Sequence, residues 1–335
     1  MINSIDKRKA LALIEAISFP YLFFWKETRK DLADSRKQLL KYIRIKTKNS
    51  KMQKITILIH CQDQKAIIAS VTNYIASIEG NIIYLDQHVD ADEDVFFMRL
   101  ECEFSAQNWD MDTIKKDFQT HLATPFKMSW EIYTQEYKPK MALFVSKYDH
   151  CLYDILGRYS AGELQLEIPL IISNHEDLRA VAERFSIPFH YVPFSKEIKM
   201  EGERKQMDLL KEYKVDFIVL ARYMQIIPPG LISLYKNKII NIHHSFLPAF
   251  PGAKPYHSAF KRGVKIIGAT SHYVTEGLDE GPIIEQDISR VSHSHSIEDF
   301  IIKGRDLERM VLARAIKLHA ERKTMVYNNK TVVFS

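Results

Sequence analysis

The stretch Ile239-Ile-Asn-Ile-His-His-Ser-Phe-Leu-Pro-Ala-Phe-Pro-Gly252 is an apolar run that passes directly into polar residues and then into prolines. A short apolar run bounded in this way is typical of a buried strand in a parallel sheet. Similar runs precede it, with helical segments between them. The runs are Met141–Ser146, Ile168–Ser173, Phe189–Val192 and Phe217–Leu220, and the helices lie near Cys151–Tyr159, Asp177–Phe185 and Glu203–Tyr213. This alternation predicts a doubly wound, mostly parallel α/β sheet.

The large domain is expected to span residues 141–335. After the parallel strands, Gly268–Val274 and Ile283–Arg290 are expected to be further strands, and Ile297–Arg322 a long helix that ends in basic residues. Ligands of doubly wound sheets bind at the carboxyl ends of the strands. Functional residues are therefore expected where the strands pass into loops.

A small α+β domain, residues 53–135, is expected before the linker 136–140. Its patterns predict the order β-α-β-β-α-β, the ferredoxin-like arrangement. The expected strands are Lys54–Cys61, Ile82–His88, Val95–Phe104 and Phe126–Tyr133, and the expected helices run from an Asp63 cap to Ile78 and over Asp110–Leu122.

The net charge of +5 belongs to the leader, residues 1–52, and not to the folded domains. Residues 1–51 hold 13 Lys and Arg against 5 Asp and Glu, so the remainder carries a net charge of −3. A nucleic-acid site on the domains is therefore not expected. The leader is too broken for a membrane span. It is either a basic amphipathic helix or upstream sequence, with Met52 as the real start.

Three cysteines in 335 residues do not make a disulfide framework, so a reducing, cytoplasmic location is expected.

Asn241 and His243 lie two residues apart, so on a strand they point to the same side. An amide N–H can stabilise an oxyanion, and an imidazole can move protons near neutral pH. Asp279 lies in a loop bounded by glycine and proline, where its carboxylate can fix a histidine tautomer or hold a water. Spacing alone leaves both a catalytic and a structural role open for these residues.

Asn241-Ile-His-His-Ser-Phe-Leu-Pro248 together with Leu278-Asp-Glu-Gly-Pro282 resembles the folate-dependent formyltransferase family, over about Lys140 to Phe334. The resemblance implies that Asn241 binds the formyl oxygen, His243 transfers protons, and Asp279 orients His243 and a water. It also implies a pterin site in two segments. The implied binding residues are Arg222, Tyr223, Met224, Gln225 and Ile226, with Leu278, Glu280, Gly281, Pro282 and Ile283. Folate is the substrate, and no metal or other cofactor is implied.

The acceptor of the formyl group is indicated by Val145–Asp154, which contains no glycine. A phosphate-binding loop needs glycines that bring backbone N–H groups to the anion, so a nucleotide acceptor is not expected. The segment resembles the deformylase subgroup, in which water is the acceptor and formate is supplied for purine synthesis. Further residues are expected to line the site: Lys147, His150 and His244.

The small domain resembles an ACT domain, on the segments Cys61–Ala66, Gly80–Ile82 and Asp86–His88. The resemblance implies a homo-oligomer and a candidate amino-acid effector loop. The effector loop comprises Asp63, Gln64, Lys65, Ala66 and Asn81. Alanine at position 66 departs from the glycine expected there, and its side chain can narrow such a site. Oligomer building and effector binding both stay open.

Two other functions remain open at this point. One is a folate-dependent transfer of the formyl group to an amine of a nucleotide or an amino-sugar. The other is a non-catalytic, amino-acid-binding regulator that keeps the fold.

Overall fold

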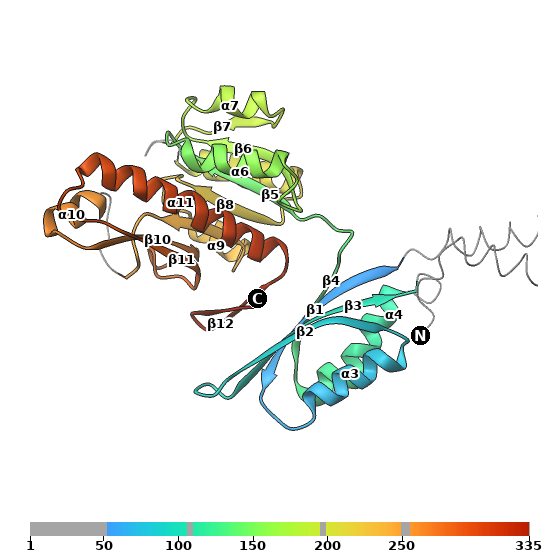
Figure 1. Ribbon diagram of the computed structural model, residues 1–335. Coiled ribbons are helices and arrows are strands. Elements are labelled where there is room, and N and C mark those ends of the chain that lie inside the picture. Colours follow the sequence, from blue (N-terminus) through green and yellow to red (C-terminus); the bar gives the residue numbers. More distant parts are fainter. Residues whose placement is uncertain (1–51, 106–109, 195–198, 249–254, 335) are drawn as a thin grey trace, which may run out of the picture. The chain divides into compact units, whose positions relative to one another are not determined.

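The computed structural model describes residues 52–105, 110–194, 199–248 and 255–334 (Figure 1). They form a four-stranded sheet, a seven-stranded sheet and a two-stranded hairpin, with helices packed on the sheets. The expected leader lies outside the described residues apart from Met52. Within the described ranges, no helix is both long enough and apolar enough to cross a membrane.

The small domain has the expected β-α-β-β-α-β order, with strands in the spatial order β2-β3-β1-β4. Its helices bury residues three or four apart, such as Ile67, Val71 and Ile75, because a helix presents such positions on one face. The elements are β1 (Gln53–Gln62), α3 (Ile67–Ser77), β2 (Asn81–Asp90), β3 (Val95–Phe104), α4 (Met111–Phe118), a π-helical segment (Gln119–Ala123), α5 (Thr124–Phe126) and β4 (Ser129–Thr134). The ferredoxin-like arrangement is confirmed.

Two boundaries in this domain differ from the prediction. Asp63 does not cap the first helix, which begins at Ile67 after Ala66, a residue with a left-handed φ of 72°. The backbone N–H of Asp63 instead donates to the Asp94 carbonyl, 2.9 Å away. Phe126 belongs to a helix and not to a strand, because the π-helical segment continues the preceding helix farther than its apolar pattern suggests.

The large sheet has the strand order β11-β10-β9-β8-β5-β6-β7, and the predicted doubly wound arrangement is confirmed. The strands β5 to β9 pair in parallel, and β10 and β11 add two antiparallel strands at one side of the sheet. The bounds are β5 (Lys140–Val145), β6 (Glu167–Ser173), β7 (Phe189–Tyr191), β8 (Phe217–Ala221), β9 (Ile239–His243), β10 (Ile266–Tyr273) and β11 (Ile283–Arg290). From β5 the chain builds outward to β7 and then returns to β8, so the strand order reverses between β5 and β8.

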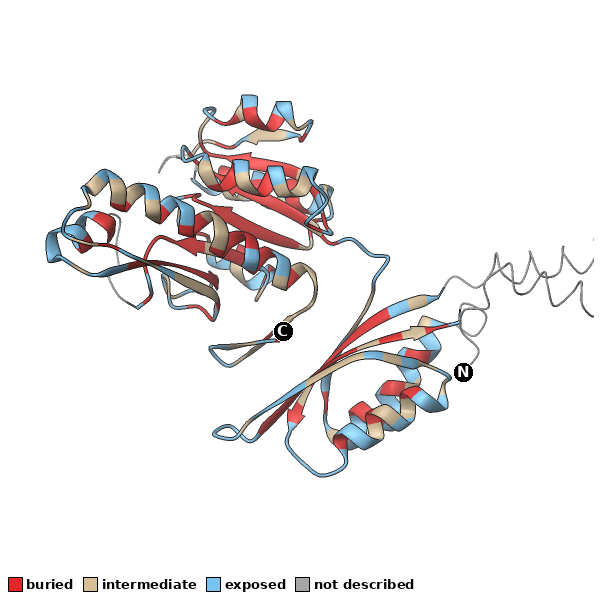
Figure 2. Ribbon diagram, viewed as in Figure 1, coloured by how far each residue is buried: buried red, intermediate tan, exposed pale blue. Residues whose placement is uncertain are grey.

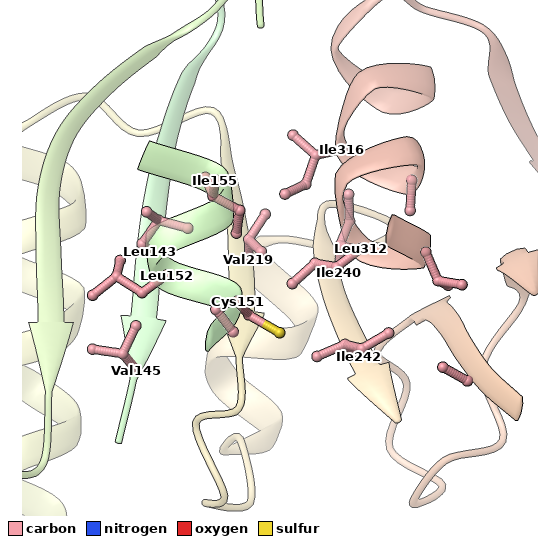
Figure 3. Packing of buried hydrophobic residues seen from close by; sticks show 14 of the residues in the cluster. Leu143, Val145, Cys151, Leu152, Ile155, Val219, Ile240, Ile242, Leu312 and Ile316 are labelled. Atoms are coloured by element: carbon pink, nitrogen blue, oxygen red, sulfur yellow. The ribbon is translucent and has the colours of Figure 1, made fainter. Parts of the chain in front are cut away.

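Helices cover both faces of this sheet and bury a separate apolar cluster on each (Figures 1 and 2). On one face α6 and α11 pack side chains such as Leu152 and Leu312 against Val219 and Ile240 (Figure 3). On the other face α8 and α9 bury Leu210 and Leu231. Each fully buried aliphatic side chain contributes about 1.5–3 kcal/mol. The helices are α6 (His150–Ser160), α7 (Arg179–Arg184), α8 (Lys199–Glu212), α9 (Pro229–Leu234), α10 (Pro255–Arg262) and α11 (Ile297–Ala320).

Four elements were not predicted. The helices α9 and α10 are short and each begins with proline, which sequence patterns present as a loop. The strands β12 (Thr324–Tyr327) and β13 (Lys330–Val333) form a hairpin around Asn328-Asn329. Each has only four residues, too few to establish an alternating pattern.

Candidate active site

Strand β9 carries Asn241 and His243 at its carboxyl end, as expected from their spacing. It lies between the parallel strand β8 and the antiparallel strand β10. Leu220 of β8 and His272 of β10 both pair with Asn241. His243 is 5% exposed. The two neighbouring strands therefore fix the backbone of β9, which carries both residues.

His243 pairs with Asp279 across the end of the sheet. Nδ1 of His243 lies 3.2 Å from Oδ2 of Asp279. An ionised carboxylate can only accept, so Nδ1 carries the proton and Nε2 holds the lone pair of the neutral ring. Nε2 is buried and has no hydrogen-bond partner among the described residues. This nitrogen is therefore available to a substrate or a water.

Asp279 is held ionised by its neighbours. Hydrogen bonds from His243 and then from His272 keep the pKa of Asp279 well below its ordinary value, although partial burial acts in the opposite direction. Its backbone adopts a left-handed φ of 58°. The loop closes tightly at Gly281, where a Cβ would lie 1.7 Å from the carbonyl oxygen of Tyr273. Glycine at this position is what lets the loop approach β10 and aim Asp279 at His243.

His272 was missed by the sequence analysis and joins the two predicted halves of the site. Its Nδ1 lies 2.9 Å from the Tyr273 carbonyl oxygen, which can only accept, so Nδ1 carries a proton. Its Nε2 lies 3.2 Å from Nδ2 of Asn241 and 3.5 Å from Oδ1 of Asp279. The neutral ring accepts a hydrogen bond from Asn241, and the protonated ring donates to Asp279. No motif includes His272, and only the β9–β10 register reveals it.

A cleft of about 500 Å³ opens beside these residues. The segment after β8 forms one wall and the loop before Asp279 forms the other. The predicted residues that line it are Asn241, His243, His244 and Asp279, with Arg222, Tyr223, Met224, Gln225, Ile226 and Leu278. The lining also includes residues that were not predicted, among them Ile232, His272, Val274 and Thr275.

Other predicted residues do not line this cleft. Gly281 and Pro282 are buried behind the loop, and Glu280 and Ile283 are exposed beyond the cleft lining. Lys147 is exposed, and Nε2 of His150 contacts Oε2 of Glu308 at 2.9 Å. In the small domain the candidate effector residues are exposed. They are Asp63, Gln64, Lys65, Ala66 and Asn81, and the effector role stays a prediction.

Glu308 is the centre of a second buried cluster. Its side chain is 1% exposed, and it accepts hydrogen bonds from His150 and, at 2.7 Å, from the hydroxyl of Tyr256. Nε of Arg222 lies 3.5 Å from the Glu308 carboxylate. Burial alone would raise the pKa of Glu308, but the His150 hydrogen bond and the charge of Arg222 bring it below its ordinary value. We call His150, Arg222, Tyr256 and Glu308 the switch-point cluster.

The same cluster offers a metal-like set of donors, since ligand atoms of His150, Cys151 and Glu308 lie within 4.8 Å of one another. Burial raises the pKa of the Cys151 thiol well above its ordinary value, so the thiol keeps its proton and is a poor ligand. Arg222 already supplies the cation that Glu308 needs. The donor set therefore suits an internal ion pair better than a metal ion.

Residues 139–316 match the formyl transferase family. The formyltetrahydrofolate deformylase of Synechocystis sp. is 50% identical over 286 residues, which cover 84% of this chain and 98% of that protein. The formyltetrahydrofolate deformylase of Bacillus subtilis is 47% identical over 280 residues, which cover 83% and 93%. The alignments thus span both domains of the chain.

Solved structures agree with these relatives. The crystal structure of a formyltetrahydrofolate deformylase from Pseudomonas syringae has a TM-score of 0.82 at 44% identity, covering 89% of this chain and 100% of that chain. A glycinamide ribonucleotide transformylase from Symbiobacterium toebii has a TM-score of 0.57 at 27% identity, covering 61% and 97%. The chain belongs to the formyl transferase family and, within it, to the formyltetrahydrofolate deformylases. The resemblance identified in the sequence is confirmed.

Proposed function

We propose that the chain hydrolyses 10-formyltetrahydrofolate to tetrahydrofolate and formate at the site formed by Asn241, His243 and Asp279. The observation that carries this proposal is the state of His243. Asp279 fixes its Nδ1 proton, and its buried Nε2 is left without a partner in a residue that lines the cleft. A base oriented in this way is the arrangement that general acid–base catalysis requires.

The nucleophile is a water held by His243 and Asp279. Its oxygen attacks the formyl carbon while Nε2 of His243 takes one of its protons. The low pKa of Asp279 supports this role, because a carboxylate that stays ionised stabilises the imidazolium as it forms. The charge that develops at the formyl oxygen is stabilised by an N–H of Asn241 and by protonated His243.

Collapse of the tetrahedral intermediate breaks the carbon–nitrogen bond. His243, directly or through a water, returns a proton to the departing nitrogen, and formic acid leaves and loses its own proton to solvent. Atoms and charge balance in these steps. The proposed steps use the folate substrate, a water and the chain's own residues.

The pterin is proposed to lie in the cleft between the segment after β8 and the loop before Asp279. Apolar side chains such as Ile226, Ile232 and Val274 line this cleft and can pack on a flat ring. The residues from Arg222 to Ile226 line the same cleft, and their backbone is proposed to bind the polar edge of the ring. The same lining makes a non-catalytic role a weaker account of the site.

A cytoplasmic location is part of the proposal. The three cysteines, Cys61, Cys102 and Cys151, are all buried and free, as in proteins from reducing compartments. An effector at the small domain and a homo-oligomer remain proposals that rest on the resemblance of that domain to ACT domains.

The test supplies the purified chain with 10-formyltetrahydrofolate and no amine acceptor. Formate and tetrahydrofolate are expected to appear in equal amounts. Turnover that begins only when a nucleotide amine or an amino-sugar is added would instead identify a transferase. Amino-acid binding without turnover would identify the regulatory alternative.

A further inference from the structure

The switch-point cluster occupies the place where a doubly wound sheet normally binds its ligand. The strand order reverses between β5 and β8, and the crevice outside their carboxyl ends is the usual binding site. Here Arg222 follows the last residue of β8, and His150 begins the helix after β5. Both residues contact Glu308 of α11. The protein's own side chains therefore fill this part of the crevice.

Arg222 is held in this place at an energetic cost. Its φ of 64° is in the left-handed region, which is sterically unfavourable for a residue with a Cβ. Its side chain is 8% exposed, and Nε and Nη1 have no hydrogen-bond partner among the described residues. Its Cζ lies 4.8 Å above the ring of Tyr148, which covers it from the solvent side. Backbone strain combined with a buried cation is typical of a functional position.

Other elements are shaped to keep the cluster in place. Burial and the neighbouring Glu308 raise the pKa of Tyr256 far above its ordinary value, so its phenol stays protonated and donates to Glu308. Gly304 lies one helical turn before Glu308, and a Cβ there would lie 2.1 Å from Cζ of Tyr256. A glycine inside a helix is destabilising relative to alanine. Its presence in α11 makes room for the Tyr256 ring.

The cluster adjoins the proposed catalytic residues. The β8–β9 register pairs Leu220 with Asn241, so Arg222 leaves the end of β8 on the strand that neighbours the one carrying His243. Both side chains contribute to the lining of the cleft. With the pterin in the cleft as proposed, we place the approach of an acceptor on the β5–β8 side, where the mostly buried guanidinium of Arg222 lines the cleft. A guanidinium repels an ammonium but not a water.

We propose that Arg222, held by Glu308, is a specificity-determining residue that excludes amine acceptors and so commits the site to water. This inference rests on the proposed catalytic role of His243. With an amine, the amine nitrogen would bond to the formyl carbon, the same carbon–nitrogen bond to the folate would break, and the amine's proton would pass to the departing nitrogen. The product would be a formamide in place of formate. Both reactions balance, and they differ only in the nucleophile.

The experiment compares the full chain with Arg222→Gly and Arg222→Met, using 10-formyltetrahydrofolate and glycinamide as the probe amine. Glycine suits the φ of 64° and opens the crevice, whereas methionine removes the charge but keeps most of the volume. Mass spectrometry measures the ratio of N-formylglycinamide to formate. We expect Arg222→Gly to raise this ratio by about tenfold or more, and Arg222→Met to raise it less.

A second variant tests the proposal even if Arg222→Gly does not fold. Tyr148 is 42% exposed, so Tyr148→Ala uncovers the guanidinium without touching the buried ion pair, and a smaller rise in the ratio is expected. Wild-type ratios in both variants would overturn the proposal. A folded Arg222→Gly that binds the folate but makes neither product would place Arg222 in the chemistry and would also overturn it. Failure of the proposed function is distinct, because the wild-type chain itself would then release no formate.

Discussion

The proposed catalytic site and the switch-point cluster are built from the same kinds of residue at neighbouring strand ends. Each pairs a histidine with a carboxylate, His243 with Asp279 and His150 with Glu308. In each pair the second ring nitrogen of the histidine has no partner among the described residues. Both members of the first pair line the cleft, whereas neither His150 nor Glu308 does, and Glu308 is 1% exposed and faces an arginine. Residue type alone therefore does not distinguish the proposed catalytic pair from the other pair; access to the cleft does.

The charges in the two regions lead to the same distinction. Among the described residues, the groups that lower the pKa of Asp279 are its two histidines, so a proton taken up by His243 is what its charge stabilises. Glu308 accepts a hydrogen bond from His150 and also faces the permanent charge of Arg222, so its charge has a counter-charge without a proton added to His150. A histidine–carboxylate pair next to a fixed cation is thus suited to structure, and one without it is suited to proton transfer.

The largest expected effect is a loss of turnover when the proposed catalytic pair is disrupted. His243→Ala removes the proposed base and should lower turnover by at least about two orders of magnitude. Steady-state formate release measures the effect. The matched control is His190→Gln on β7, the opposite edge of the sheet, which should keep wild-type turnover. Near-normal formate release by His243→Ala would show that the proposed assignment of the base is wrong.

The next effect concerns the switch-point cluster. Glu308→Gln leaves the buried Arg222 without its counter-charge, and breaking a buried pair costs about 3–5 kcal/mol. Urea unfolding of Glu308→Gln should show a loss of that size. The variant Asp279→Asn should lose far less stability than Glu308→Gln, but its turnover should fall far more. The control on the same helix is Asp306→Asn, an exposed residue that should change stability by less than about 0.5 kcal/mol. Equal stability losses for Glu308→Gln and Asp306→Asn would contradict the distinction drawn between the two regions.

The sequence predicted one of these regions much better than the other. Asn241, His243 and Asp279 lie in short motifs at strand ends, where polar residues interrupt apolar runs. Glu308 lies in the middle of a long helix, where a carboxylate is usually a solvated residue. Nothing local distinguishes it, because its partners come from α6, α10 and the end of β8. His272 was missed for a similar reason, since it reaches the site through strand pairing.

The fold was predictable to the extent that local patterns repeat. Each parallel strand was located from its apolar run, to within a residue or two. Errors arose where backbone geometry overrides side-chain pattern. Asp63 has the side chain of a helix cap, yet the left-handed Ala66 delays the helix to Ile67. Arg222 likewise has a glycine-like backbone that no pattern of side chains reveals.

The smallest expected effect is the pH dependence of the stability that Asp279 contributes to the catalytic region. The folded-state pKa of Asp279 lies below its unfolded value, near 3.8, so its carboxylate contributes stability that is fully present above about pH 5 and is lost as the pH falls further. The difference in unfolding free energy between the wild type and Asp279→Asn should therefore stay constant from pH 8 to about pH 5 and shrink by about 1 kcal/mol by about pH 3. Urea unfolding at a series of pH values measures it. If the difference instead grew as the pH fell from about 7 to 6, the titrating group would be a histidine, because a protonated imidazole bound by Asp279 adds stability that is lost as the pH rises. The stabilising element would then be a protonated His243 or His272 in the resting protein, and the neutral His243 on which the proposed attack of water depends would have to be formed by loss of that proton.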